Sequence, residues 1–367
     1  MDLGFLSVPL TMAAMAFGFA VVTDTQSVVI DKITLPAAVA SATNGYTPEV
    51  VLKHLADEMH EIERQAQSRA EARKLQLSGH KSAVSVLADF MKVTPLMRVA
   101  QETAGLIPFK FTGDIIVSGG DLKMVLRGHG SHQKSRHIVV KAPPDQLDQL
   151  IRLTAYEAMR LIDPYIVAAY QFRKDFKSRD YTRTLEIIQS ELGDSEKKLS
   201  TNRKWLYNLW GMVLYQQADR AGAIEKFQAA LAIDPNFASP MLNWGVVLTR
   251  QGHNQEAIER FRAVISNRRT DASEATLAAT NSEWGFALAL LGQYEQAFAK
   301  FRQAVSIDPG FADVYSSWAE VLSALGRADE AATMTERSVK LAPTEVIYTE
   351  NLVGPVQNLP ATASVIN

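Results

Sequence analysis

A tryptophan–glycine pair that recurs through the C-terminal half constrains this chain more than any other feature. The four occurrences are Trp210-Gly211, Trp244-Gly245, Trp284-Gly285 and Trp318-Ala319, at spacings of 34, 40 and 34 residues. An alanine lies thirteen residues after each tryptophan, and in the first three copies a phenylalanine follows it four residues later. An internal repeat of this length predicts a stacked helical array rather than one globular core.

Each repeat has the spacing of two helices joined by a turn. In the first copy, apolar residues recur at helical intervals on both sides of a polar segment, residues 217–221. The glycine and the alanine are small, so the two helices can approach each other closely. We expect the phenylalanine to fill the space between one hairpin and the next, and the tryptophans to belong to the core rather than to a cofactor site. One hairpin cannot bury its apolar face alone, so the array is stable only as a stack.

The pattern resembles the tetratricopeptide repeat. The resemblance covers residues 161–345, with four clear repeats from about residue 204 and a degenerate hairpin before them. It implies an all-α solenoid whose inner wall, formed by the first helix of each hairpin, binds a peptide or another protein. Carried over position by position, this inner wall consists of Asn208, Met212, Gln216, Asn243, Val246, Arg250, Ser282, Phe286, Ser316 and Glu320. Some members hold a peptide's terminal carboxylate with lysines at matching positions, and this chain lacks those lysines.

Two inner-wall residues carry the sharpest expectation. Phe286 is a large ring among small or polar wall positions, which predicts an exposed anchor for the partner. Arg250 lies one hairpin earlier and is expected to pair with an acidic group of the partner beside that anchor. We therefore expect Phe286→Ala and Arg250→Glu to weaken partner binding without lowering stability.

The first residues of the chain are strongly apolar. Residues 3–22 contain no charged side chain, and twenty helical residues span about 30 Å, the thickness of a hydrocarbon core. This predicts a single-pass transmembrane anchor over residues 1–24. A cleaved signal peptide is the alternative, because Gly18 and Ala20 are small residues near a possible cleavage point, but the usual basic segment before the apolar run is missing. We expect the protein in a bacterial inner membrane, with its soluble part in the periplasm.

Residues 25–160 have a mixed pattern that predicts an α+β module. The expected strands are residues 27–35, 109–111, 114–118, 122–126 and 137–141, with a turn from Ser118 to Asp121. Helices are expected to begin at Thr47-Pro48-Glu49, Ser82 and Pro143. The glycine-rich strand–turn–strand segment around residues 113–122 resembles the TolB-like α/β domains that precede tetratricopeptide arrays in bacterial envelope proteins.

Motifs of catalysis are missing from the sequence. There is no phosphate-binding loop, no His-Glu-x-x-His helix and no Gly-x-Ser-x-Gly elbow, and the absence of cysteine excludes thiolate chemistry. His54 and His60 lie on different helical faces, and cations surround the group His129, His132 and His137, so we predict neither a metal site nor a cofactor. The formal net charge of −2 and the dispersed basic residues give no indication of nucleic-acid binding.

The sequence therefore predicts an α+β module followed by an all-α tetratricopeptide solenoid, with one N-terminal transmembrane helix and a partly flexible tail over residues 346–367. Its predicted function is that of a non-enzymatic, membrane-anchored scaffold whose array binds a protein or peptide. Two alternatives stay open. One is an enzyme or small-ligand sensor with its site in residues 25–160, and the other is a structural spacer.

Overall fold

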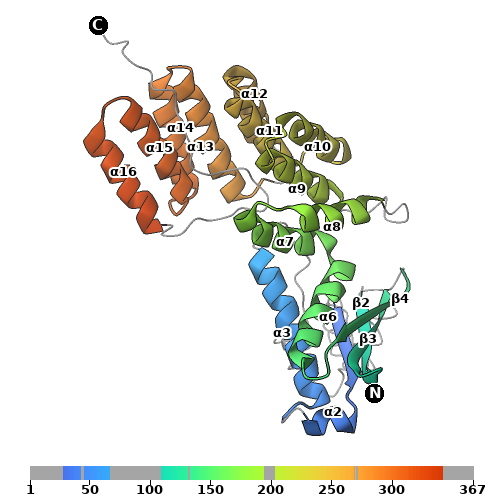
Figure 1. Ribbon diagram of the computed structural model, residues 1–367. Helices are drawn as coiled ribbons and strands as arrows, with labels where there is room; N and C mark the ends of the chain where they lie inside the picture. Colours follow the sequence, from blue (N-terminus) through green and yellow to red (C-terminus); the bar gives the residue numbers. More distant parts are fainter. Residues whose placement is uncertain are drawn as a thin grey trace, which may run out of the picture. The chain divides into compact units, whose positions relative to one another are not determined.

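The computed structural model describes residues 28–42, 45–66, 109–130, 133–193, 203–267, 269 and 272–341. The chain divides after Asp163 into an α+β unit and a helical array (Figure 1), against a predicted boundary at residue 160. No helix in the described ranges is both long enough and apolar enough to cross a membrane. The predicted anchor at residues 3–22, the helix expected from Ser82 and the tail over residues 346–367 lie outside the described residues.

The α+β unit contains a four-stranded sheet in the order β1-β2-β3-β4. The strands are β1 (Val28–Thr34), β2 (Phe109–Ser118), β3 (Asp121–Gly130) and β4 (Gln133–Ala142). The first pair is parallel and the other two are antiparallel. The two strands expected at residues 109–111 and 114–118 form one continuous strand. Gly119 and Gly120 have φ angles of 66° and 90°, the left-handed conformation that a two-residue hairpin turn requires, so the turn expected between Ser118 and Asp121 is confirmed.

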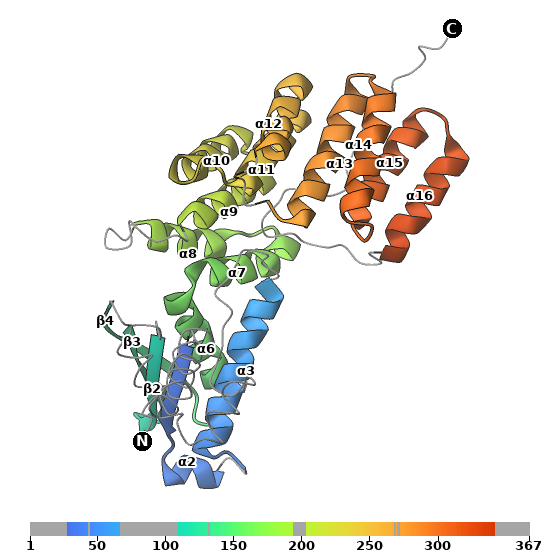
Figure 2. The same cartoon turned by 180° about the vertical axis from the view of Figure 1, so that it is seen from behind.

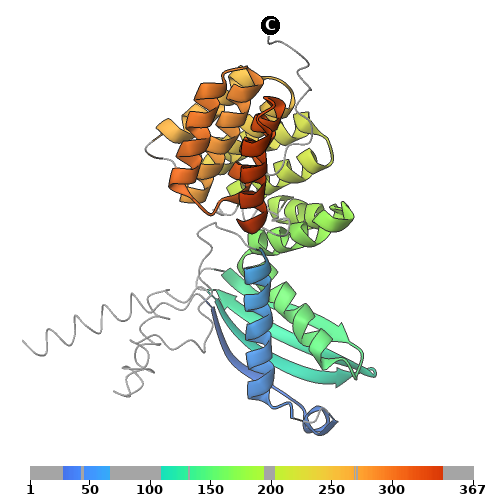
Figure 3. The ribbon, with the colours of Figure 1, turned by 90° about the vertical axis from the view of Figure 1, so that its left-hand side faces the viewer.

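One face of this sheet is covered by helices. Alternate residues of β3, namely Leu122, Met124 and Leu126, are buried, and α6 (Leu147–Ile162) packs on β3 and β4. Figure 3 shows α6 and α3 (Pro48–Ala66) crossing the same face of the strands. The unit also contains a short helix, α2 (Ala37–Ala42), that the sequence pattern did not predict.

The two predicted helix starts within the described part of this unit have different outcomes. Thr47 Oγ1 accepts the N–H of Val50 at 3.3 Å, so the capped start of α3 is confirmed. The start expected at Pro143 is wrong by a few residues, because α6 begins at Leu147. The carbonyl of Pro143 accepts the N–H of Gln146 at 3.0 Å, which closes a turn ahead of the helix instead.

The second unit is an array of five helical hairpins within the described residues. They are α7 (Pro164–Ser178) with α8 (Thr182–Gly193), α9 (Arg203–Gln216) with α10 (Arg220–Ile233), α11 (Ala238–Arg250) with α12 (Asn254–Ser266), α13 (Glu274–Leu290) with α14 (Tyr294–Ile307), and α15 (Ala312–Ala324) with α16 (Ala328–Leu341). The first helices of successive hairpins contact one another, and each second helix packs on the first helix of the following hairpin. Figures 1 and 2 show the resulting order of the array from opposite sides.

Close contact at the repeated glycine holds each hairpin together. A Cβ atom added at Gly245 would lie 2.4 Å from the ring of Phe261, and one added at Gly211 would lie 2.5 Å from the ring of Phe227. The close approach expected at this glycine is therefore confirmed. The phenylalanine ring packs mainly inside its own hairpin, against the glycine. It also contacts the next hairpin, because the Phe301 ring centroid lies 5.8 Å from that of Trp318 in the next repeat.

The repeated tryptophans are only half-buried, so the expectation that they belong wholly to the core needs correction. A cation from the second helix covers each of the first three rings. The charged groups of Lys226, Arg260 and Lys300 lie 4.5, 4.5 and 3.6 Å from the ring centroids of Trp210, Trp244 and Trp284. The sequence signal for these cation–π contacts is a basic residue sixteen positions after the tryptophan, which the fourth repeat replaces with Met334.

The spacing of 40 residues between the second and third tryptophans has a structural cause. Helix α13 begins at Glu274, which is eleven residues before its glycine, whereas α11 begins seven residues before Gly245. Ser273 caps the longer helix, because its side chain accepts the N–H of Thr276 at 3.2 Å. The extra residues of this repeat therefore lengthen α13, the first helix of its hairpin, and the loop before it.

The hairpin of α7 and α8 has no tryptophan–glycine pair, and a buried carboxylate connects its helices. Asp175 Oδ1 accepts the side-chain amide of Gln171 at 2.7 Å, and its Oδ2 accepts the hydroxyl of Thr184 at 2.7 Å and that residue's N–H at 3.2 Å. A carboxylate with several donors is well satisfied in a buried position. This hairpin corresponds to the degenerate repeat expected ahead of the four clear ones.

Candidate functional site

All ten residues of the predicted inner wall lie on the first helices α9, α11, α13 and α15. Six of them are buried, namely Asn208, Met212, Asn243, Val246, Ser282 and Phe286. The four that are partly exposed are Gln216, Arg250, Ser316 and Glu320. A partner could contact this second group without any rearrangement of the array.

Phe286 is not the exposed anchor that the sequence suggested. Its side chain is 1% exposed, and the guanidinium of Arg250 lies 5.4 Å from its ring centroid. The small residues around Phe286 on α13 let neighbouring helices pack on its ring. The pattern that suggested an exposed ring therefore belongs to a buried, packed position. Replacing Phe286 would therefore lower stability, which corrects the expectation that Phe286→Ala affects binding alone.

Arg250 has an acidic partner inside this chain. Its Nη2 atom lies 3.5 Å from Oε2 of Glu283, whose side chain is 3% exposed. The expected pairing of Arg250 with an acidic group of a partner stays a prediction, and the contact with Glu283 indicates that Arg250→Glu would lower stability as well. Sequence reasoning missed Glu283, although a signal existed: it directly precedes Trp284, at the position where the other repeats carry Leu209, Asn243 and Ser317.

The carboxyl of Glu283 is held in an unfavourable environment for its charge. Burial raises the pKa of Glu283 above its ordinary value, and the negative charges of Asp313 and Glu320 on α15 act in the same direction. The guanidinium of Arg250 opposes this rise in pKa. We call these four residues the acidic end of the inner wall, because they combine three carboxyl groups with one guanidinium.

The other end of the inner wall is held by an amide pair. Asn243 Nδ2 donates to Asn208 Oδ1 at 2.9 Å, and both side chains are fully buried. This hydrogen bond joins α9 to α11 and satisfies polar groups that would be costly to bury unpaired. The main structural role of the two asparagines is therefore to hold consecutive repeats together.

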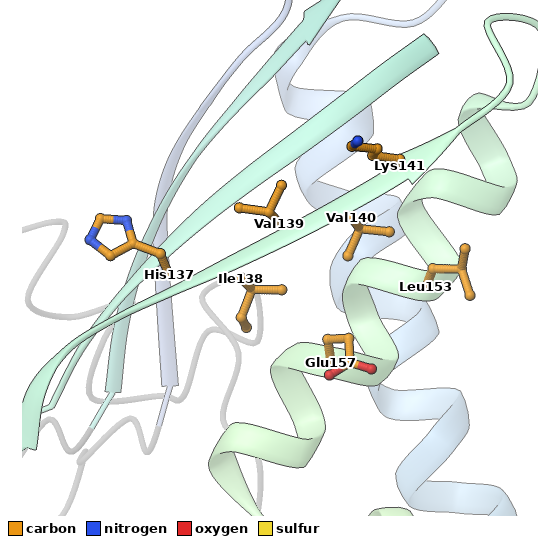
Figure 4. Close-up of a pocket in the computed structure, with 7 residues that line it drawn as sticks. All are labelled: His137, Ile138, Val139, Val140, Lys141, Leu153 and Glu157. Atoms are coloured by element: carbon orange, nitrogen blue, oxygen red, sulfur yellow. The ribbon is translucent and has the colours of Figure 1, made fainter. Parts of the chain in front are cut away.

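A second concave feature lies in the α+β unit, between β4 and α6. It has a volume of about 440 Å³ and is lined by His137, Ile138, Val139, Val140, Lys141, Leu153 and Glu157 (Figure 4). Its titratable side chains do not include a nucleophile paired with a base. Within the ranges that the structure describes, no three His, Asp or Glu side chains are grouped so as to hold a metal ion.

Of the group His129, His132 and His137, the structure describes the side chain of His137 alone. His137 is exposed in β4, whereas the side chain of His129 and the whole of His132 lie outside the described residues. On α3, His60 Nδ1 lies 3.0 Å from the carbonyl of Ala56, and His54 Nδ1 lies 3.3 Å from the hydroxyl of Tyr46.

Comparisons with known proteins agree with the helical array. Models described as tetratricopeptide repeat match residues 205–237 and 288–348. A search of curated proteins finds no match to this chain.

Several solved structures are similar to this chain at low identity. MamA is 18% identical, with a TM-score of 0.34, over 46% of this chain and 93% of MamA. PilF of Pseudomonas aeruginosa is 15% identical, with a TM-score of 0.39, over 52% of this chain and 79% of PilF. YrrB, described as a TPR protein with an unusual peptide-binding site, is 16% identical, with a TM-score of 0.32, over 52% of this chain and 93% of YrrB. Likenesses this distant do not bear on the partner of this chain.

The hairpin geometry, the glycine–phenylalanine contact and the two matching segments lead to one assignment. Residues 205–237 and 288–348 of this protein are tetratricopeptide repeats, within a helical array whose intervening hairpins have the same form.

Proposed function

We propose that this protein is a non-enzymatic scaffold whose repeat array binds a protein or peptide along the inner wall. Proteins built from tetratricopeptide repeats typically mediate protein–protein interactions and are generally not enzymes. Stacked first helices offer an extended surface that spans several repeats. The partly exposed residues Gln216, Arg250, Ser316 and Glu320 lie on α9, α11 and α15, three of the four first helices that carry the predicted wall, so one extended partner could contact all of them.

The observation that carries this proposal is the acidic end of the inner wall. Asp313 and Glu320 are partly exposed beside the buried Glu283, so this part of the wall has three carboxyl groups and one guanidinium. Complementary charge favours a partner segment that presents lysine or arginine there. We therefore propose a partner with a basic segment, with apolar or polar residues along the rest of the wall.

The test begins with the full-length protein crosslinked in its native cells and the captured partner identified by mass spectrometry. Purified partner is then titrated against the parent protein, Glu320→Lys and Glu259→Lys. Glu259 is exposed on the second helix α12 and gives the same charge change away from the wall. We expect Glu320→Lys to weaken binding about tenfold, with a smaller loss at high salt, and Glu259→Lys to leave it unchanged. Equal binding by all three proteins would contradict the proposal.

We further propose that residues 3–22 anchor the protein in a membrane without being cleaved. The support is the length and apolar character of this segment. The membrane fraction should then retain the protein after carbonate extraction, and intact-mass analysis should find residues 1–24 still attached. A mature chain that begins near Val21 and appears in the soluble fraction would show a cleaved signal peptide instead. The bacterial envelope location and the likeness of the α+β unit to TolB-like domains stay predictions.

A further inference from the structure

The edge of the sheet at β4 has the chemistry of a second binding site, independent of the repeat array. In the described part of the sheet, β4 pairs with β3 on one side only. Along its other side, alternate residues direct their backbone N–H and C=O groups away from the sheet. Such a row of backbone groups is a template for an added strand.

The groove beside this edge is apolar enough to bind side chains. On the helix side of this edge, Leu153 of α6 is 41% exposed, a large value for an aliphatic residue, and Ile138 and Val140 of β4 lie on the same side, whereas Val139 lies with Lys141 on the opposite face of the strand. Figure 4 shows β4 running alongside α6, with Ile138 and Val140 next to Leu153 and Glu157. A strand added at β4 would place alternate side chains over this groove.

The charge of β4 indicates what kind of strand fits. Among the residues of β4 whose side chains the structure describes, Lys141 is a cation and none is acidic. Lys141 also lies directly opposite Lys123 of β3 in the sheet register, and like charges in that position destabilise a strand pair. An acidic strand beside β4 would reduce this repulsion. A second copy of β4 would add to it.

We propose that an extended peptide segment of a partner protein, with acidic residues alternating with apolar ones, adds to β4 as a further strand. Its backbone pairs with the side of β4 that no described strand occupies, its acidic side chains lie on the face of Lys141, and its apolar side chains lie on the face of Val140, over Leu153 of α6. Glu157, on the helix side of the groove, disfavours an acidic side chain at that point and so helps to set the register of the strand. This site would let the α+β unit hold a partner while the array binds another segment.

The test uses the full-length protein and synthetic six-residue peptides with blocked ends. One peptide alternates glutamate with valine, a second alternates lysine with valine, and a third repeats the first with alternate backbone nitrogens methylated. We expect the acidic peptide to bind at least tenfold more tightly than the other two, because the second has the wrong charge and the third cannot donate its N–H groups. Bound acidic peptide should slow amide hydrogen exchange in β4.

Two variants distinguish a strand-binding site from general charge attraction. Lys141→Glu should reverse the preference between the acidic and basic peptides. Lys53→Glu makes the same charge change at an exposed position of α3 and should leave the preference unchanged. Equal binding of the methylated and unmethylated acidic peptides would overturn the proposal. Slow amide hydrogen exchange along the outer side of β4 before any peptide is added would also overturn the proposal. In a monomer or in a dimer, it would show that the edge is already occupied.

Discussion

Replacing Phe261 with alanine is expected to lower the free energy of unfolding of the repeat array by about 3–5 kcal/mol. The ring is fully buried and lies against Gly245, so its removal leaves a cavity inside the hairpin. Adjacent hairpins should loosen as well, because each repeat is stabilised by its neighbours. Urea unfolding gives the change in free energy, and amide hydrogen exchange in α11 to α13 shows how far the loosening extends.

The glycine provides the control for this first prediction. Gly245→Ala should itself be destabilising, because the added methyl group overlaps the Phe261 ring. In the Phe261→Ala background the same methyl group enters the cavity, so the double variant should lose less stability than the sum of the two single variants. Strictly additive losses would show that the two residues are not in contact. Arg262→Ala, at the adjacent exposed position, should change stability by no more than about 0.5 kcal/mol.

Arg250→Met is expected to destabilise the array by about 3 kcal/mol at pH 7. The variant keeps much of the side-chain volume above Phe286 but leaves the buried carboxylate of Glu283 without its compensating charge. Adding Glu283→Gln should recover most of the loss, because a neutral amide has no need of the guanidinium. A loss that persists in the double variant would mean that Arg250 acts through packing alone.

The pH dependence of Glu283 follows from the direction of its pKa shift. Burial raises the pKa of Glu283 in the folded protein, so the folded state binds a proton more tightly there than the unfolded state does. Glu283 therefore lowers stability as pH rises from the ordinary glutamate pKa through the raised value, and has no such effect at lower pH. Because Glu283→Gln removes this ionisation, the stability of the variant relative to the parent should increase as pH rises from about 4 towards neutral. A difference in stability that is constant with pH would contradict the shift.

The hairpins of the array were predictable because the contact that forms them is local. Gly245 and Phe261 are sixteen residues apart in one hairpin, and their small–large pairing repeats in Gly211 with Phe227. A residue's exposure on the wall was less predictable, because it depends on the neighbouring hairpin. Phe286 looked exposed in the sequence, but the guanidinium of Arg250 from the previous repeat lies 5.4 Å from its ring centroid.

In the α+β unit, the strands were predictable and their pairing was not. Alternation along β3 identifies its buried face, and the glycine pair identifies the turn before it. The parallel pairing of β1 with β2 joins residues about 80 positions apart, and no local pattern specifies such a neighbour. The groove at β4 and α6 was missed for the same reason, since it exists only when the last strand lies beside the helix that follows it.

The central claim, that a partner binds along the inner wall, is tested most directly by site-specific photocrosslinking in native cells. A photoreactive amino acid is placed at Gln216 or Ser316 on the wall, and at Glu259 or Arg302 on the exposed sides of α12 and α14. We predict that the two wall positions crosslink to the same partner protein and that the two second-helix positions do not. Crosslinks to that partner from Glu259 and Arg302, with none from Gln216 and Ser316, would contradict the account.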